Sequence, residues 1–493
     1  MSKINLPIAE LKPALTGLGK IISKRSILPV LGCIKVDRTK EGWVVLTSTD
    51  IDSFITVRLE EPAEGAPVSI LVPYDDVTRI TKRCQKNETI SIEKAAGDKA
   101  LISFPIGNQT AQEHVESLAV AEFPPVPKIK SDPVAFNNDI RSSLLEAFQC
   151  ASTDETRLIL NGAYIDVSKK ECHQIVGTDG RHLFASNSFT LALKESLIIP
   201  SHKFLGWKEF SIDGEWQLRV QQPEKKDEIG LLQISSRRWR FITRQIEGIY
   251  PNWRQVIPRE DGFKSTVEFE QAAVKDLVQT IDRLPCVDKI NQRVGIKVTG
   301  RKISFIGQTE GQPVSVEITE ATGRGSDVVI YLNRNIVGKA LGFGLFRMQI
   351  TDGLSPARFS DDAGRQIIVM PIRPDGPPPT VSTATAKTTA DPEPNGDGEA
   401  EPVNSEASPE RNTDMPKTTS TNGNGHQATA APKPALESAI DHIESIKTSL
   451  RAAKDGLNDL FDCLKQVQRE QKTTEREVQS VRTTLEKLQQ VRI

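Results

Sequence analysis

Residues 175–186, IVGTDGRHLFAS, predict two short strands joined by a polar turn that gathers three groups able to do chemistry. Asp179, Arg181 and His182 lie together at the tip of this turn. An acid beside a histidine can transfer protons or help to hold a metal ion, and with an arginine the same groups can bind the polar atoms of a partner. The turn is therefore a candidate catalytic site, metal site or binding surface.

Established catalytic motifs are absent from the sequence. The Gly-Lys pair of LTGLGKII does not complete a phosphate-binding loop, because Ala14 and Ile21 stand where that loop needs glycine and serine or threonine. There is no H-E-x-x-H, no G-x-S-x-G, and no C-x-x-C among the six cysteines. Adjacent Asp361 and Asp362 are typical of a solvated loop. We therefore expect a protein that is not an enzyme and needs no metal or cofactor.

The composition indicates a soluble protein with reduced cysteines. A chain of 493 residues is long enough for about three domains, at roughly 150 residues each. The cysteines are widely spaced, which favours free thiols over a disulfide framework. No signal-type leader and no run of about 18 apolar residues is present. We expect a cytoplasmic location.

A weak repeat divides residues 1–373 into three modules, called here the first, second and third repeats. Amphipathic helical stretches begin at Pro7, Asn137 and Glu270. Each is followed by strand-like runs around a Thr-acid turn, in LTSTDIDSFITV, IVGTDGRHLFAS and FIGQTEGQPVSV, and then by a second short helix and more strands. We predict an α+β fold of three domains, each with two helices and the strands of two packed sheets, at 1–129, 130–258 and 259–373.

The rest of the chain has a different composition. Residues 374–434 are rich in Pro, Gly, Ser, Thr and acids, which predicts a disordered linker. Heptads then run from Leu436 to Leu488, with 14 of 16 a and d positions apolar, so residues 435–493 are predicted to be a coiled-coil helix. We expect two such helices to pair in parallel, with a different protein or a second ring as the alternative partner.

Basic residues recur on or beside the predicted helices of all three repeats. Residues 374–493 hold 14 Lys or Arg and 19 Asp or Glu, which leaves a net charge of +3 for residues 1–373. Any one of these cations could belong to a solvated helix face, but their recurrence favours a surface that attracts phosphates without reading bases. The candidate DNA-contacting residues are Lys20, Lys24, Arg25, Arg79, Lys82, Arg83, Arg141, Lys203, Lys275, Arg334 and Lys339.

Several stretches, in order along the three repeats, resemble the bacterial DNA polymerase III beta subunit family, the sliding clamps. They are KRSILPVLGCIKV (24–36), STDID (48–52), AEFPPVP (121–127), RLILNGAYIDV (157–167), GTDGRHLFA (177–185), LIIPSHKF (197–204), IEGIYPNWRQVIP (246–258) and QIIVMPIR (366–373). The resemblance covers about three quarters of the chain. It implies the DNA-clamp fold and a ring of two protomers, with helices lining the hole and sheets outside. It also implies that duplex DNA is held without sequence preference, and that Arg25 matches the family's DNA-contacting arginine.

The resemblance also implies a role for the turn at Asp179. In the family this turn borders an apolar pocket that receives linear motifs of polymerase, clamp-loader and repair proteins, and slots of this kind suit extended peptides. The matching residues here are Leu160, Thr178, Gly180, Arg181, His182, Leu183, Pro251, Val256, Ile368, Met370, Pro371 and Ile372.

Two positions depart from the family pattern. Arg181 and His182 stand in the reverse of the family's usual order, and Gln255 replaces a frequent arginine. Because neighbouring strand residues face opposite ways, the reversal predicts a different side chain facing the pocket. A divergent clamp-like scaffold that recruits repair or chromosome-organising factors through its tail is the alternative function, and a nuclease is the third.

Overall fold

The computed structural model describes residues 3–23, 28–223 and 228–373. All of them belong to the first of two compact units, Met1–Ala384. The predicted linker (374–434), the predicted coiled coil (435–493), Lys24 and Arg25 lie outside the described residues. Within the described part, no helix is long and apolar enough to cross a membrane.

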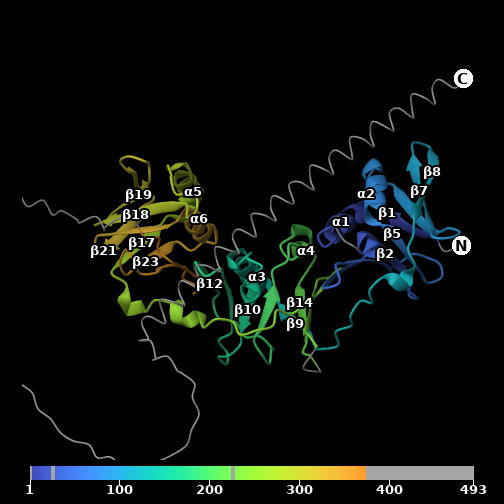
Figure 1. The fold of residues 1–493 in the computed structure, drawn as a ribbon, viewed down its shortest axis with the longest axis horizontal. Helices are drawn as coiled ribbons and strands as arrows, with labels where there is room; N and C mark the ends of the chain where they lie inside the picture. The colour runs from blue at the N-terminus through green and yellow to red at the C-terminus, as the bar shows by residue number, and fades with distance from the viewer. Residues whose placement is uncertain (1–2, 24–27, 224–227, 374–493) are drawn as a thin grey trace, which may run out of the picture. The chain divides into compact units, whose positions relative to one another are not determined.

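The first repeat is built around two helices, α1 (Ile8–Leu18) and α2 (Tyr74–Arg83), which pack on each other (Figure 1). Ile8, Leu11 and Leu15 recur at helical spacing and are buried, so one face of α1 belongs to the core. Helix α1 contacts strands of two different sheets. One is a four-stranded antiparallel sheet of β1 (Ile4–Pro7), β6 (Thr89–Lys94), β7 (Lys99–Ile106) and β8 (Gln109–Glu116), in that spatial order.

The other sheet has eight strands and joins the first repeat to the second. In spatial order the strands are β5 (Val68–Pro73), β2 (Cys33–Arg38), β3 (Val44–Thr49), β4 (Ser53–Arg58), β16 (Trp239–Arg244), β15 (Leu231–Ser235), β14 (Trp216–Gln221) and β9 (Val134–Phe136). The joint is the antiparallel pair β4–β16, in which Ile55 lies opposite Phe241. Both side chains are buried, so the core continues across the joint.

A nine-stranded sheet joins the second repeat to the third in the same way. In spatial order the strands are β13 (Leu197–Pro200), β10 (Gly162–Asp166), β11 (Gln174–Thr178), β12 (His182–Ala185), β25 (Gln366–Val369), β24 (Ala357–Ser360), β23 (Arg347–Ile350), β17 (Ser265–Phe269) and β21 (Ala321–Gly325). The antiparallel pair β12–β25 places Leu183 opposite Ile368. The chain's last described strand, β25, therefore lies between the strands of the second repeat and those of the third.

Helices cover this sheet and the last one. In the second repeat, α3 (Asn138–Cys150) lies on β11, and α4 (Lys208–Ile212) is a short second helix. In the third repeat, α5 (Val274–Arg283) and α6 (Arg334–Gly342) pack on each other. The strands of its four-stranded sheet, in spatial order, are β20 (Val314–Ile318), β19 (Lys302–Gly307), β18 (Arg293–Thr299) and β22 (Val328–Asn333).

The predicted α+β repeat is confirmed at the level of elements. The helices expected after Pro7, Asn137 and Glu270 are α1, α3 and α5, and each Thr-acid turn joins two strands. Helix α4 is shorter than its counterparts α2 and α6, and it ends just before Gly214, whose φ of 115° is not helical. The sharing of sheets between repeats was not predicted.

Candidate peptide-binding site and basic helix surface

The turn at Asp179 is held by hydrogen bonds from its own residues. The Thr178 hydroxyl accepts from Gly180 N at 3.0 Å, and Asp179 Oδ1 accepts from His182 N at 2.9 Å. Gly180 has a φ of 86°, a conformation that favours glycine. The first repeat has the same arrangement, in which Asp50 Oδ1 accepts from Ser53 N at 2.8 Å. The turn is therefore a shared structural feature of the repeats.

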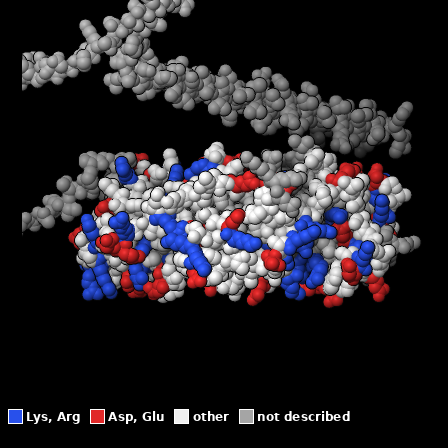
Figure 2. All heavy atoms as spheres, turned by 90° about the horizontal axis from the view of Figure 1, so that it is seen from below, with Lys and Arg blue, Asp and Glu red and all other residues white. Residues whose placement is uncertain are grey.

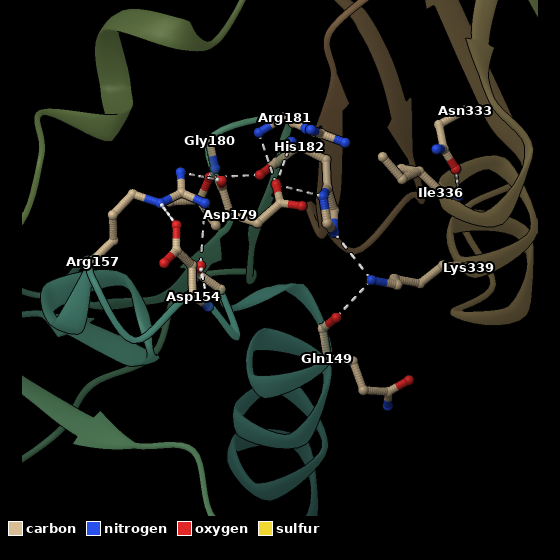
Figure 3. A network of polar contacts seen from close by, with 12 residues as sticks. Gln149, Asp154, Arg157, Asp179, Gly180, Arg181, His182, Asn333, Ile336 and Lys339 are labelled. Atoms are coloured by element: carbon tan, nitrogen blue, oxygen red, sulfur yellow. Dashed lines mark hydrogen bonds and ion pairs between the residues drawn. The ribbon is translucent and has the colours of Figure 1, made fainter. Parts of the chain in front are cut away.

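His182 connects this turn to the third repeat. Its Nδ1 lies 2.8 Å from Asp179 Oδ1, and its Nε2 lies 3.1 Å from Nζ of Lys339 on α6 (Figure 3). The ammonium can only donate, so Nε2 accepts and Nδ1 carries the proton that is donated to Asp179. Lys339 also donates to the carbonyl of Gln149, at the end of α3, at 2.6 Å. The chain of contacts fastens α6 to the turn and to α3.

Asp179 remains ionised over a wide pH range. Burial raises the pKa of Asp179. Hydrogen bonds from His182, the charge of His182 and backbone N–H groups outweigh burial and lower this pKa to about 2. Arg157 supports the turn from the other side, donating to the carbonyl of Asp179 at 2.9 Å. No group of three or more His, Cys, Asp or Glu in the described ranges is arranged to hold a metal ion. The polar groups here act as supports of a surface.

An apolar cluster lies on one side of β12 and β25. Leu183 is 4% exposed and Ile368 is fully buried, and Leu160 packs beside them. By alternation along β12, His182 and Phe184 face the opposite side, toward the helices. The remaining members of the cluster, hereafter the apolar pocket cluster, are Val176, Ala185, Ile198, Tyr250 and Trp253, with Ile159, Tyr164, Ile246 and Ile257 at its edge.

A loop over residues 250–257 closes one side of the apolar pocket cluster and is anchored to β10. The anchor is the buried carboxylate of Asp166, which accepts from Trp253 Nε1 at 2.9 Å and from Arg254 Nη1. Burial raises the pKa of Asp166, but hydrogen bonds from Ser168 and Trp253 outweigh it, so the pKa is lowered. Tyr250 stacks on Tyr164 with ring centroids 4.5 Å apart. These contacts leave Pro251 and Gln255 exposed and Val256 half-buried at the rim.

The segment after β25 forms the other side. Met370 N donates to the carbonyl of Arg181 at 3.0 Å, and Ile372 N donates to the carbonyl of Tyr331 at 2.8 Å. Met370, Pro371 and Ile372 are half-buried, so they combine a fixed backbone with accessible apolar atoms. The structure thus brings Leu160, Leu183, Ile368 and Met370 to one region, as the sequence predicts.

Three lysines of the first repeat gather between its two helices. A cavity of about 560 Å³ between α1 and α2 is lined by Lys12, Lys20 and Lys82, together with Thr16 and Thr81. Lys12 donates to the carbonyl of Cys84 at 2.9 Å. Arg83, Lys203 and Lys275 are exposed in their respective repeats. Each of these cations is accessible to an anion.

Four predicted DNA-contacting residues have other partners. Arg334 is 7% exposed and donates to the carbonyls of residues 282, 284 and 285, so its assignment to a DNA surface is corrected. Arg79 is paired with Asp76 and Glu113. Arg141 is half-buried and donates to Ser211 O and Asn138 Oδ1, and Lys339 is engaged by His182 and Gln149. Helical position alone predicts neither burial nor ion pairing.

Comparison with known proteins connects this geometry to one family. A family model of the DNA polymerase III beta subunit, N-terminal domain, matches residues 6–127. The Beta sliding clamp of Synechocystis sp. is 24% identical over 398 residues, covering 74% of this chain and 97% of the relative. That of Streptococcus pneumoniae serotype 4 is 23% identical over 342 residues, covering 65% and 84%. The resemblance to the sliding clamp family is confirmed.

Solved structures agree on the clamp fold. The DNA polymerase sliding clamp from Bacillus subtilis superposes with a TM-score of 0.64 at 21% identity, covering 76% of this chain and 99% of that one. The C. crescentus beta sliding clamp gives a TM-score of 0.65 at 19% identity, covering 75% and 98%. The described residues therefore have the sliding clamp fold, with mixed helices and sheets.

Sequence reasoning left out several residues that the structure places in or beside the apolar pocket cluster. Tyr250 and Trp253 belong to the apolar pocket cluster, and Asp166 and Arg157 hold its edges. The aromatic residues of IYPNW gave a usable signal, because large apolar side chains next to a proline are typical of an ordered loop. Asp166 gave no local signal, since its partners lie 87 and 88 residues away.

Proposed function

We propose that this protein is a DNA sliding clamp, the non-catalytic processivity factor of a replicative DNA polymerase, acting in the cytoplasm. The supporting observation is that the chain matches a Beta sliding clamp over 97% of that protein's length. In this proposal, residues 1–129, 130–258 and 259–373 are the three domains of one protomer. Two protomers close head to tail into a ring around duplex DNA, and no cofactor takes part.

The free edges of the two four-stranded sheets support ring closure. Strand β8 ends the sheet of the first repeat, and β20 ends the sheet of the third. Unpaired edges offer a row of backbone hydrogen-bonding groups to another strand. Val314 and Val316 on β20 are 42% and 37% exposed, and Ile106 beside β8 is 60% exposed. We propose that β8 of one protomer meets β20 of its partner.

The cations on the helices support duplex binding without sequence preference. Lys20 and Lys82 line the cavity between α1 and α2, and Lys203 and Lys275 are exposed in the other repeats. None of them belongs to a base-reading motif, so contacts to phosphates are expected to dominate and to weaken steeply with salt. Lys24 and Arg25 belong to this proposed surface by sequence alone.

The apolar pocket cluster supports the tethering of polymerase, clamp-loader and repair proteins through linear motifs. Leu183 and Ile368 form its floor, while Met370 and Pro371 present accessible apolar atoms at its rim. Backbone groups of the nearby turn and of the segment after β25 can pair with an extended peptide. Arg181 is exposed whereas His182 faces the helices, so Arg181 is the residue of the reversed pair that a peptide would meet.

A processivity assay tests this function. The matching replicative polymerase and clamp loader extend a primer on circular template, with excess competitor DNA to prevent rebinding. We expect long products only when the protein is present, and short products with Met370→Lys. Product lengths that do not depend on the protein would instead favour the divergent scaffold, for which the heptads from Leu436 to Leu488 would supply the recruiting coiled coil.

A further inference from the structure

The eight-stranded sheet carries an arginine-rich groove on the face opposite its core. The groove has a volume of about 370 Å³ and crosses the joint between the first two repeats. Residues with polar side chains outnumber apolar ones in its lining. Arg58, Arg219, Arg237, Arg238 and Arg240 line it together with serine, threonine and glutamine side chains, and it is hereafter called the arginine groove.

Strand register explains why the arginines gather. Arg240 on β16 lies opposite Thr56 on β4 and opposite Ser235 on β15. Arg58 donates its backbone N–H to the carbonyl of Arg238 at 3.0 Å, so these two residues are neighbours across the joint. Trp239 and Phe241 alternate with the arginines and are buried. Alternation along β16 therefore points Arg238 and Arg240 to the same open face.

The charges of the arginine groove are only partly balanced. Arg237 binds Glu60 through two bonds of 2.9 and 2.7 Å, and Arg238 binds Asp213 at 2.9 Å. Among the residues that the structure describes, no carboxylate forms an ion pair with Arg58, Arg219 or Arg240. Arg240 is exposed, but partial desolvation and then the nearby charge of Arg219 lower the pKa of its guanidinium. Such crowding of like charges is relieved when an anion binds.

The groups present are those that bind phosphate diesters. Protein contacts to nucleic-acid backbones come from arginine together with serine, threonine and glutamine, and all four types line the arginine groove. A platform for stacking bases is missing from its lining, because Trp239 is buried and the Trp43 ring is covered by Arg58 at 4.3 Å. Figure 2 shows Lys and Arg side chains in several groups along one face of the described residues, with carboxylates among them.

We propose that the arginine groove is a second nucleic-acid site, which binds the sugar–phosphate backbone from outside the ring and without sequence preference. Arg58 and Arg240 contact phosphates, and Arg219 does so with the guanidinium N–H groups that do not donate to the carbonyl of Ser131. The hydroxyl and amide side chains complete the donor set. Arg237 and Arg238 already hold Glu60 and Asp213 and shape the rim. This site goes beyond the proposed clamp function, because it needs neither ring closure nor a clamp loader.

The test uses the full chain and covalently closed circular DNA without a clamp loader, because a closed circle offers no end for a closed ring to thread. We expect wild-type protein to bind, and Arg219→Ala with Arg240→Ala to bind at least about ten-fold more weakly. The slope of log K against log salt should fall by about 2, one for each lost phosphate contact. The double lysine variant at the same positions should retain most of the binding.

Matched controls separate the site from net charge and from the clamp function. Arg301→Ala with Arg324→Ala removes two exposed cations of the third repeat and should leave binding unchanged, and melting temperatures verify folding. The variant with Arg219→Ala and Arg240→Ala should still be loaded onto nicked circular DNA by a clamp loader. If loading fails for wild type and variant alike, the clamp proposal is wrong, and the result for the arginine groove is unaffected. Unchanged binding by the groove variant would overturn this inference. So would tighter binding of a ten-residue oligoglutamate than of a ten-nucleotide oligomer.

Discussion

Single residues around Asp179 determine how the pocket is built. The ring of His182 lies between a carboxylate and the ammonium of Lys339, and the residue is 4% exposed. The cluster that suggests a catalytic site in the sequence is therefore a fixed support for neighbouring apolar groups. Sequence reasoning identified Leu183 and Met370 but could not establish their accessibility, because burial depends on segments far apart in the chain.

Met370→Lys is expected to weaken binding of a clamp-binding peptide at least about 30-fold, which corresponds to about 2 kcal/mol. The reason is that Met370 is half-buried at the rim and its change removes apolar contact without filling the core. Titration calorimetry measures the loss. The control is Leu354→Lys, since Leu354 is 61% exposed elsewhere; equal affinities for the two variants would argue against the pocket.

Leu183→Lys is a poorer probe of the apolar pocket cluster than Met370→Lys. Leu183 is 4% exposed, so an ammonium there would be buried among apolar side chains. We expect about 3 kcal/mol of destabilisation in addition to lost peptide binding.

Asp179 should contribute a pH-dependent part of the stability. Its pKa is lowered from 3.8 to about 2, so the contribution is present above the unfolded pKa and is lost as pH falls from about 4 to about 2. Asp179→Asn should therefore cost about 2 kcal/mol at pH 7, and this difference from wild type should shrink toward pH 2. Chemical denaturation at several pH values measures it. A difference that is constant with pH would show that the carboxylate charge is not responsible.

At the scale of elements, apolar periodicity predicts the helices correctly and strand pairing between repeats remains hidden. Helices α1, α3 and α5 follow from local spacing of buried residues. The pairs β4–β16 and β12–β25 depend on backbone hydrogen bonds between segments more than 170 residues apart. Such pairs leave no pattern in the local sequence, because any strand with an apolar face could pair with the exposed edge of β4 or β12.

Gly177→Ala should destabilise the second repeat by about 1–3 kcal/mol. A Cβ at Gly177 would lie 2.1 Å from the carbonyl oxygen of Ala147, so α3 would have to move away from β11. Gly206→Ala is the matched control, because nothing lies within 4 Å of its Cβ position. Thermal or urea unfolding compares the two variants, and equal stabilities would mean that the close packing of α3 on β11 is unimportant.

At the scale of the whole molecule, the clamp account depends on closure around DNA. The family resemblance predicted the fold, whereas the list of basic residues was only partly useful. Lys20 and Lys82 line the same cavity between α1 and α2. Arg334 instead donates hydrogen bonds to backbone carbonyls of the third repeat. Sequence cannot distinguish these roles, since both place a cation on or beside a helix.

Retention on circular DNA tests the central claim most directly. The protein is loaded onto nicked circular DNA by its clamp loader, free protein is removed, and the DNA is then cut once with a restriction enzyme. A ring that encircles the duplex is held on the circle at high salt and slides off the ends after cutting. We predict loss of nearly all bound protein on linearisation, as measured by gel filtration. Protein that stays bound to the linear DNA, or that leaves the intact circle at high salt, would contradict the account.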